Sequence, residues 1–158
     1  MPVRPMKRYL AFDLGTKTGW AVGNKFWLSS SGVINLNERG RFSPRGFSLF
    51  QAHVGALIAK YQADDLVIGV EKPHNGPYFH ATHILFGLLG VLEATCQTAG
   101  RKLDLYSPAT IKKYWTGNGR AGKPEMMKET RRLGFEPEDH NESDAIALLY
   151  LISGVKRE

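Results

Sequence analysis

Residues 7–22 read KRYLAFDLGTKTGWAV, and this stretch decides the fold. It predicts an apolar strand over 7–13, a tight glycine-bearing turn and a second strand that begins near Trp20. The first strand ends on Asp13, where neither β-propensity nor burial favours a carboxylate. Ligands and metals bind at the carboxyl ends of strands in α/β sheets, so Asp13 is a candidate functional residue. The structural alternative is that Asp13 only accepts hydrogen bonds from the amides of the following turn.

The rest of the chain predicts further strands and helices around this start. A strand over 26–34 completes an antiparallel meander, and the polar, basic segment 35–44 is expected to be a mobile surface loop. The remaining patterns predict a helix over 50–61, a buried strand over 66–70, an apolar helix over 84–96, a strand over 102–106, and helices over 107–115, 124–133 and 139–152. The predicted order is β-β-β-α-β-α-β-α-α-α, an α/β fold with a mixed five-stranded sheet flanked by helices.

Two further carboxylates are unusually placed. Glu71 directly follows a strand-length apolar run, as Asp13 does. Asp144 shares the spacing i, i+4, i+7 with Leu148 and Leu151, so it lies on the apolar stripe of its helix, and Asn141 lies one turn earlier on the same face. A carboxylate aimed at the core requires a cation or a strong hydrogen-bond donor.

Together the three acids predict a site for a hard cation. Carboxylate oxygens without clustered His or Cys favour Mg²⁺ or Mn²⁺ over zinc. Two such ions about 3.5–4 Å apart perform in-line phosphoryl transfer. Asp139 and Glu142 have the spacing of a helix capping box, so a ligand role and a structural role both remain open for them.

Composition narrows the class of protein. The 158 residues are expected to form one domain over 1–158, and the net charge of +6 favours polyanionic partners, nucleic acid first. The one cysteine, Cys96, excludes a disulfide framework within the chain and fits a reducing cytoplasm. No apolar run is expected to span a membrane, and residues 1–6 do not have the pattern of a signal peptide.

Four ordered motifs resemble one known family. They are FDLGTKTGWA around Asp13, IGVEKP around Glu71, SPATIKK followed by TGNGRAGK over 107–123, and DHNESDAIA around Asp144. In this set and order the chain resembles the RuvC-type Holliday junction resolvases, and it is similar to the compact forms that bacteriophages carry.

The resemblance implies an RNase H-like fold and a homodimer with two metal-dependent sites, each holding two Mg²⁺ or Mn²⁺ ions. These sites would nick opposed strands of a four-way junction and leave 5′-phosphate and 3′-hydroxyl ends. It implies that Asp13, Glu71 and Asp144 are the catalytic metal ligands. The family usually has an Asp or His three residues before the last acid, where this chain has Asn141. Asn141 itself is one candidate for the fourth ligand, and Asp139, His140 and Glu142 are the others.

Basic and aromatic residues near the acids are candidate DNA contacts. The set comprises Lys17, Tyr78, Lys112, Lys113, Arg120 and Lys123. Lysine and arginine neutralise phosphates, glycines at 117–122 let backbone amides approach them, and an aromatic ring stacks on an unpaired base. The structural alternatives are a solvated lysine at Lys17, an ordinary turn at 117–122, and a ring that covers the core, an assignment that favours Phe79.

Two other functions compete with junction cleavage. The DLGTKTG motif also fits a YqgF-type RNase H-fold nuclease that acts on RNA, whereas the basic segment 107–123 favours the resolvase. Asn141 weakens the expected metal site, which is compatible with a catalytically weak module that binds branched DNA. For a resolvase, the expected location is the cytoplasm, or the host cytoplasm if a phage encodes it.

Overall fold

The structure, a computed structural model, describes residues 6–155. The expectation that the N-terminal stretch is not a signal peptide concerns residues 1–6, of which residues 1–5 lie outside this range. The elements are β1 (Arg8–Asp13), β2 (Lys17–Gly23), β3 (Leu28–Asn35), α1 (Arg45–Lys60), β4 (Leu66–Glu71), α2 (Phe79–Thr98), β5 (Leu103–Tyr106), α3 (Pro108–Thr116), α4 (Lys123–Arg132) and α5 (His140–Ile152). This is the predicted order, element for element.

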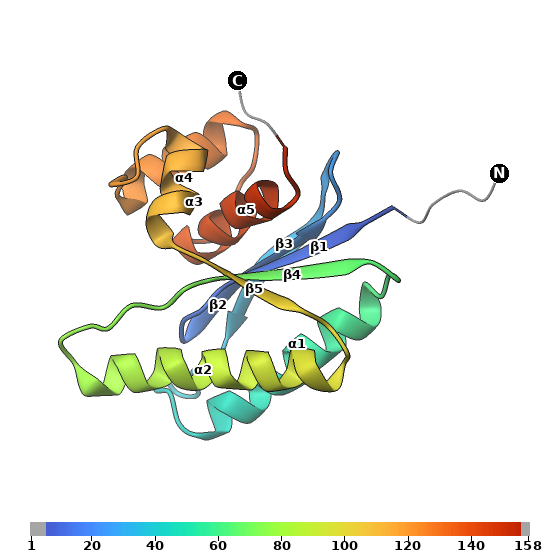
Figure 1. The fold of residues 1–158 in the computed structure, drawn as a ribbon. Coiled ribbons are helices and arrows are strands. Elements are labelled where there is room, and N and C mark those ends of the chain that lie inside the picture. The colour runs from blue at the N-terminus through green and yellow to red at the C-terminus, as the bar shows by residue number, and fades with distance from the viewer. Residues whose placement is uncertain (1–5, 156–158) are drawn as a thin grey trace.

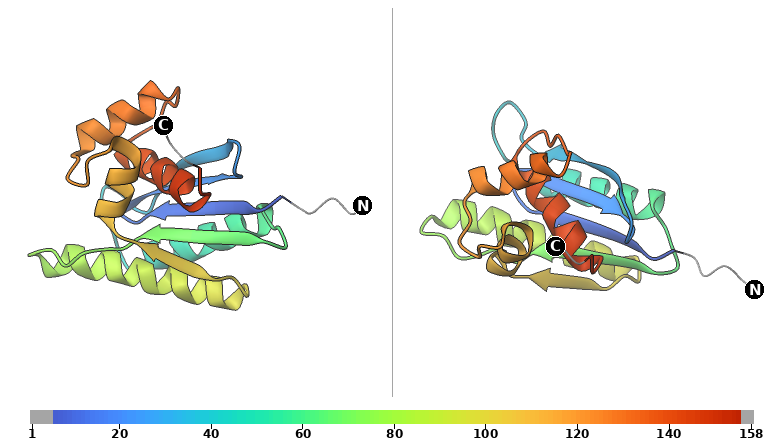
Figure 2. Two further views of the ribbon diagram at one scale, coloured as in Figure 1. Left: turned by 45° about the horizontal axis from the view of Figure 1, so that its top comes forward. Right: turned by 90° about the horizontal axis from the view of Figure 1, so that it is seen from above.

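The strands form one mixed sheet in the order β3-β2-β1-β4-β5. β1–β2 and β2–β3 are antiparallel, whereas β1–β4 and β4–β5 are parallel. α1 and α2 cover one face, and α3, α4 and α5 lie on the other (Figures 1 and 2). The predicted α/β class and mixed five-stranded sheet are therefore confirmed.

Each face of the sheet has its own apolar core, and alternate residues of β1 contribute to the two cores. Leu10 and Phe12 are fully buried in the cluster that includes α1 and α2. Ala11, between them, belongs to the cluster built on α3, α4 and α5. The strand residues that are fully buried on this side, Ala11 and Ala21, are small, so α5 packs close to the strands.

The boundaries differ from the prediction in the first part of the chain. β2 begins at Lys17, earlier than expected, because residues just before Trp20 already pair with β1 and β3. β3 begins at Leu28, which leaves the rings of Phe26 and Trp27 exposed in the turn before it. The segment expected to be a mobile loop contains an ordered tight turn, closed by mutual backbone hydrogen bonds between Glu38 and Arg41.

The expectation that no apolar run reaches membrane-spanning length is wrong for α2. By length and composition this helix, with a mean hydropathy of 1.3 over an 18-residue window, is the one candidate span within residues 6–155. Ile84, Leu88 and Leu92 of α2 are buried in the core shared with α1. A helix that packs on a core meets the same test, so the finding is weak evidence for a membrane segment.

Candidate functional site

Two of the predicted acids end adjacent parallel strands. Asp13 is the last residue of β1 and Glu71 the last of β4, and the residues just before them, Phe12 and Val70, are paired in the parallel register of the two strands. Phe12 and Val70 belong to the core under α1 and α2. Because successive side chains of a strand alternate between faces, Asp13 and Glu71 point to the side of α5.

α5 supplies the third acid from the opposite end of the chain. Asp139 caps this helix: its Oδ1 accepts a hydrogen bond from the Glu142 amide at 2.9 Å. Asp144 follows within the next turn, and Asp13, Glu71 and Asp144 can each offer a ligand oxygen such that the three oxygens lie within 4.8 Å of one another. The structure thus brings together the three carboxylates that the sequence singled out.

Burial disfavours the ionised forms of the three carboxyl groups and raises the pKa of each. Burial is the largest cause that raises the pKa of Asp13 well above its ordinary value, and the carboxylates of Glu71 and Asp144 raise it further. Burial and then Glu71 raise the pKa of Asp144 to about 7, against the opposing charges of Lys112 and Lys123. The pKa of Glu71 is also raised by burial, although Lys112 lowers it.

These residues fit a divalent cation. Asp144 Oδ1 is buried and has no hydrogen-bond partner among residues 6–155. A buried carboxylate oxygen without a donor is costly, and a hard cation bound between the three acids would compensate that cost as well as their mutual repulsion. The donor set consists of oxygens, which suits Mg²⁺ or Mn²⁺.

The acids lie in a pocket of about 260 Å³ that also contains positive charge. Lys112 enters it from α3 and Lys123 from the first residue of α4. The full lining is Asp13, Leu14, Glu71, Lys72, Pro73, His74, Leu85, Lys112, Lys123, Met126, His140, Asn141 and Asp144. A pocket lined by three carboxylates and three lysines can hold a metal and a phosphate side by side.

The four candidates for a fourth ligand have different positions. His140 and Asn141 line the pocket. Asp139 is not among its lining residues: its Oδ2 accepts a hydrogen bond from Asn141 Nδ2 at 3.2 Å. Glu142 points elsewhere, because its carboxylate accepts hydrogen bonds from Ser31 Oγ at 2.7 Å and from the Glu138 amide at 2.6 Å. The expected capping box is thus only half formed, since Glu142 caps the amide of Glu138 rather than that of Asp139.

The predicted DNA contacts divide in a similar way. Lys112 and Lys123 line the pocket, whereas Lys17, Lys113 and Arg120 are exposed and do not. Tyr78, just before α2, is 74% exposed. The interpretation that favoured Phe79 as a core cover is wrong.

Phe79 is 83% exposed because it lies at the start of α2, where the helix extends beyond the sheet (Figure 1). Its ring stacks on His83 with the two centroids 5.7 Å apart.

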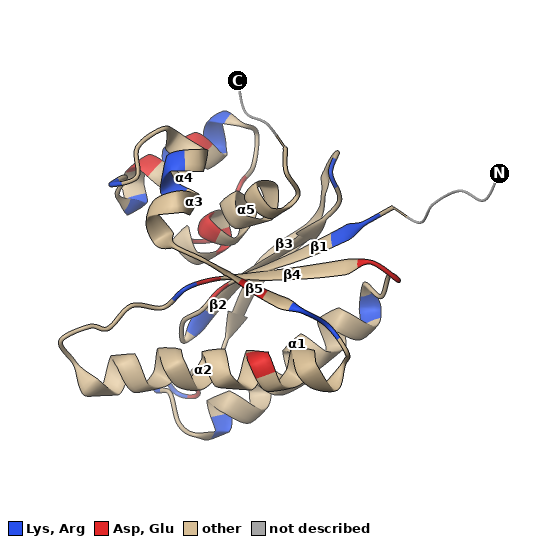
Figure 3. Cartoon of the chain, in the orientation of Figure 1, with Lys and Arg blue, Asp and Glu red and all other residues tan. Residues whose placement is uncertain are grey.

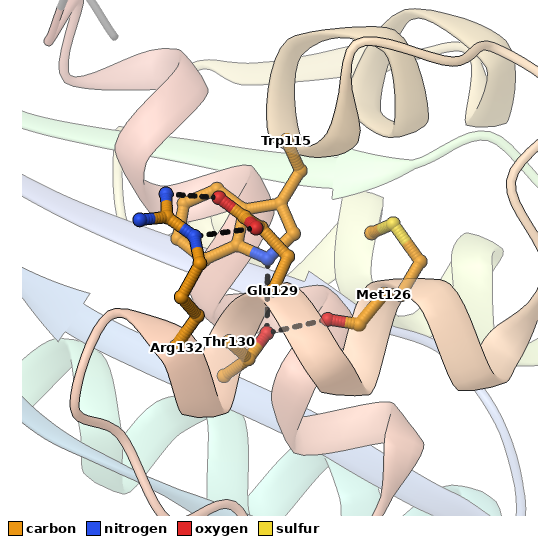
Figure 4. Close-up of polar contacts among 5 residues, drawn as sticks. All are labelled: Trp115, Met126, Glu129, Thr130 and Arg132. Atoms are coloured by element: carbon orange, nitrogen blue, oxygen red, sulfur yellow. Dashed lines mark hydrogen bonds and ion pairs between the residues drawn. The ribbon is translucent and has the colours of Figure 1, made fainter. Parts of the chain in front are cut away.

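A buried polar network behind the pocket joins side chains that the sequence does not mark as site residues. Thr130 Oγ1 accepts a hydrogen bond from Trp115 Nε1 at 2.9 Å, donates to the Met126 carbonyl at 3.0 Å and lies 2.7 Å from Ser143 Oγ. Figure 4 shows the indole of Trp115, from α3, directed at this hydroxyl on α4, with the Arg132–Glu129 ion pair nearby. The network ties α3 and α4 to the residue that precedes Asp144.

The comparisons with known proteins agree with this geometry. No family model matches the chain. A crossover junction endodeoxyribonuclease RuvC from Rhodopirellula baltica is 33% identical over 155 residues, which cover 88% of this chain and 82% of the relative. The enzyme of the same name from Anaeromyxobacter sp. (strain K) is 36% identical over 94 residues, 59% of this chain. The chain spans only about half the length of that relative.

A solved structure, Thermus thermophilus RuvC in complex with a Holliday junction substrate, has the same fold. Its TM-score is 0.76, and the match covers 91% of each chain at 19% sequence identity. At this identity the likeness concerns the fold alone, and it confirms the predicted RNase H-like arrangement. The family follows from the sequence relatives: this chain belongs to the RuvC family of crossover junction endodeoxyribonucleases.

Proposed function

We propose that the protein is a metal-dependent endonuclease that cuts four-way DNA junctions. One observation carries the proposal: three carboxylates from β1, β4 and α5 bring ligand oxygens within 4.8 Å of one another in a pocket that also contains Lys112 and Lys123. The family relatives are named for crossover junction cleavage. The net charge of +6 is compatible with a nucleic acid substrate.

The residues of the pocket have separate roles in this proposal. Asp13, Glu71 and Asp144 hold the cations, probed as Mg²⁺ or Mn²⁺ and proposed as two per site. When bound, such ions supply Lewis-acid stabilisation of the charge on the phosphate and lower the pKa of water. Lys112 and Lys123 place positive charge beside the non-bridging oxygens of the scissile phosphate.

The reaction is a hydrolysis with inversion at phosphorus. A water oxygen forms a bond to the phosphorus, the bond from phosphorus to the 3′ oxygen breaks, and this oxygen leaves as a 3′-hydroxyl after it gains a proton. The water oxygen remains on the 5′-phosphate. Burial and Lys123 lower the pKa of His140, which lines the pocket. Asp139 opposes this shift, and we propose that the imidazole of His140 accepts the proton that the attacking water loses.

We also propose that two copies pair through α2. Glu93 is the one Asp, Glu, Lys or Arg residue on this helix, and Figure 3 shows the rest of α2 free of charged positions. Phe86 is 43% exposed on α2, and Leu105 on the neighbouring edge strand is exposed to the same extent. A symmetric interface would place two sites on the opposed strands of a two-fold junction. Sedimentation of wild type and Phe86→Glu at micromolar concentration tests this, with a dimer expected only for wild type.

A substrate panel tests the proposed activity and separates it from the two competing functions. Wild-type protein is incubated with Mg²⁺ or EDTA and with a synthetic four-way junction, a DNA duplex or structured RNA. Junction cleavage that requires Mg²⁺ supports the proposal. Cleavage of the RNA alone supports the YqgF-type alternative, and tight junction binding without cleavage supports the silent binding module.

A further inference from the structure

A second groove adjoins the active-site pocket on the α2 side of the sheet. Its volume is about 520 Å³, and it lies between the turn after β3 and the first turns of α2. The lining residues are Thr16, Asn37, Gly40, Arg41, Phe42, His80, Ala81, Ile84 and Leu85. Leu85 lines both cavities, so the groove opens next to the pocket that contains the acids.

The groove combines an apolar wall with an unpaired amide. Ile84, Leu85 and the ring of Phe42 form the apolar part. At the rim, the side-chain amide of Asn37 makes no hydrogen bond with any of residues 6–155. An amide presents a donor and an acceptor together, the pattern that reads the edge of a nucleobase.

The groove is held in shape by the turn beside it. Arg39 and Gly40 both have positive φ, 52° and 75°, in a tight turn closed by the hydrogen bonds between Glu38 and Arg41. Phe42 packs on Gly46, where a Cβ would collide with its ring, and meets Phe47 edge-on with centroids 5.0 Å apart. A preformed apolar slot costs little ordering free energy when a flat ring enters it.

Its charge favours a nucleic acid over an apolar peptide. Arg41 and His80 line the groove, and Arg39 is exposed on the adjacent turn. The acid on this turn, Glu38, pairs with Arg45 at 3.4 Å. A nucleotide fits these features, because its flat base can pack on the apolar wall, the edge of the base can bond to the Asn37 amide, and its phosphate can lie near the arginines.

We propose that this groove receives one nucleobase, unstacked from the strand whose phosphate lies at the acids, and that Asn37 contacts the edge of this base. This rests on the proposed function for the identity of the strand, and it adds a site that selects the nucleotide next to the cut. Ala81 lies in the groove wall and has an exposed side chain, so a larger residue there fills the groove without disturbing the core.

The test measures how the affinity of each protein variant changes when one nucleotide of the junction lacks its base. Junctions that carry one abasic nucleotide at successive positions beside the crossover are titrated in EDTA with wild type, Ala81→Leu, Asn37→Ala and the control Ala52→Leu. Ala52 is exposed on α1, outside the groove. Wild type and control should lose affinity roughly fivefold to a hundredfold at one abasic position, the range for one stacked base. Ala81→Leu should lose less than twofold there, because its groove is already closed, and Asn37→Ala should fall between.

An equal ratio of intact to abasic affinity in all four proteins, at every position, overturns the proposal while junction cleavage stands. If wild type does not prefer the junction to duplex, the proposed function fails instead. The same titrations on a single-stranded oligonucleotide then test the groove by itself. A loss of affinity at one abasic position in wild type but not in Ala81→Leu supports the proposal. Equal ratios of intact to abasic affinity in the two proteins overturn it.

Discussion

Gly19 of β2 lies directly against the backbone carbonyl of Asn141 at the start of α5. A Cβ at position 19 would overlap the carbonyl carbon and oxygen of Asn141, and it would lie 2.7 Å from the Glu142 amide. The site depends on this approach, because α5 carries Asp144 to the two carboxylates at the ends of β1 and β4. The glycine therefore determines how closely the third acid can approach the sheet.

We expect Gly19→Ala to displace the start of α5, because backbone cannot yield as a flexible side chain does. Both the thermal midpoint and the cleavage rate should fall strongly. Gly55→Ala is the matched control: it lies within α1 with no atom within 4 Å of the added Cβ, and it should stabilise by up to about 1 kcal/mol. A Gly19→Ala protein with unchanged midpoint and cleavage rate would contradict this role.

The raised pKa of Asp144 predicts that its contribution to the free energy of unfolding of the metal-free protein becomes less favourable as pH rises. The ordinary pKa of an aspartate is 3.8, and in the folded protein the pKa of Asp144 is raised to about 7. Between these values the folded state binds more protons than the unfolded state, so this carboxyl group lowers the free energy of unfolding as pH rises.

The measurement is the thermal midpoint in EDTA at pH 5 and pH 7.5, for wild type and Asp144→Asn. His140, with a lowered pKa, acts in the opposite sense, so the difference between the two proteins is the informative quantity. The variant should gain over wild type at pH 7.5, by roughly 2–4 °C for each kcal/mol relieved, and should gain less at pH 5, where only part of the range between the two pKa values has been crossed. An equal difference in thermal midpoint between the two proteins at both pH values would show that the pKa of Asp144 is not raised in the folded protein.

The positions of the basic residues predict two classes of variant. Lys112→Ala and Lys123→Ala should lose single-turnover rate more than junction affinity, because both side chains line the pocket. Lys113→Ala and Arg120→Ala, exposed outside it, should instead weaken affinity and reduce the salt slope by roughly one unit each. Four variants with the same ratio of rate loss to affinity loss would show that the pocket does not distinguish them.

Thr130 is expected to act as a positioning residue for the pocket. Thr130→Val removes the hydroxyl that accepts the hydrogen bond from Trp115 Nε1 and contacts Ser143 Oγ, and each buried hydrogen bond lost should cost about 1 kcal/mol. Thr130→Ser keeps the hydroxyl and should retain both stability and rate. The specific readout is the Mg²⁺ dependence of cleavage, since a shifted α5 should raise the Mg²⁺ concentration needed. An unchanged Mg²⁺ dependence in Thr130→Val would limit the network to stability.

Much of this arrangement follows from sequence periodicity. Alternation along β1 and β4 sends Asp13 and Glu71 to the same face, and helical spacing aims Asp144 at them, so three acids were predictable from patterns of two and 3.6 residues. The close approach at Gly19 was not, because a glycine in a strand does not say which backbone lies opposite.

Other residues depended on packing that local pattern does not encode. Glu142 has the spacing of a capping partner, yet it bonds to Ser31 on β3, a contact that exists only once α5 lies on the sheet. Phe79 is apolar but lies where α2 passes beyond its partners, so it is exposed. Thr130 and Ser143 are ordinary helix-surface residues by sequence, and only the crossing of α4 and α5 brings their hydroxyl groups together.

The most direct test of the central claim is single-turnover cleavage of a four-way junction with all four strands labelled separately, in Mg²⁺, by wild type, Asp144→Asn and Glu142→Gln. Wild type should nick two opposed strands at symmetric positions and leave 5′-phosphate ends. Asp144→Asn should bind the junction but not cut it. Glu142→Gln, an acid of the same helix that points away from the pocket, should lose stability and still cut. Cleavage by Asp144→Asn at a rate near that of wild type would contradict the account.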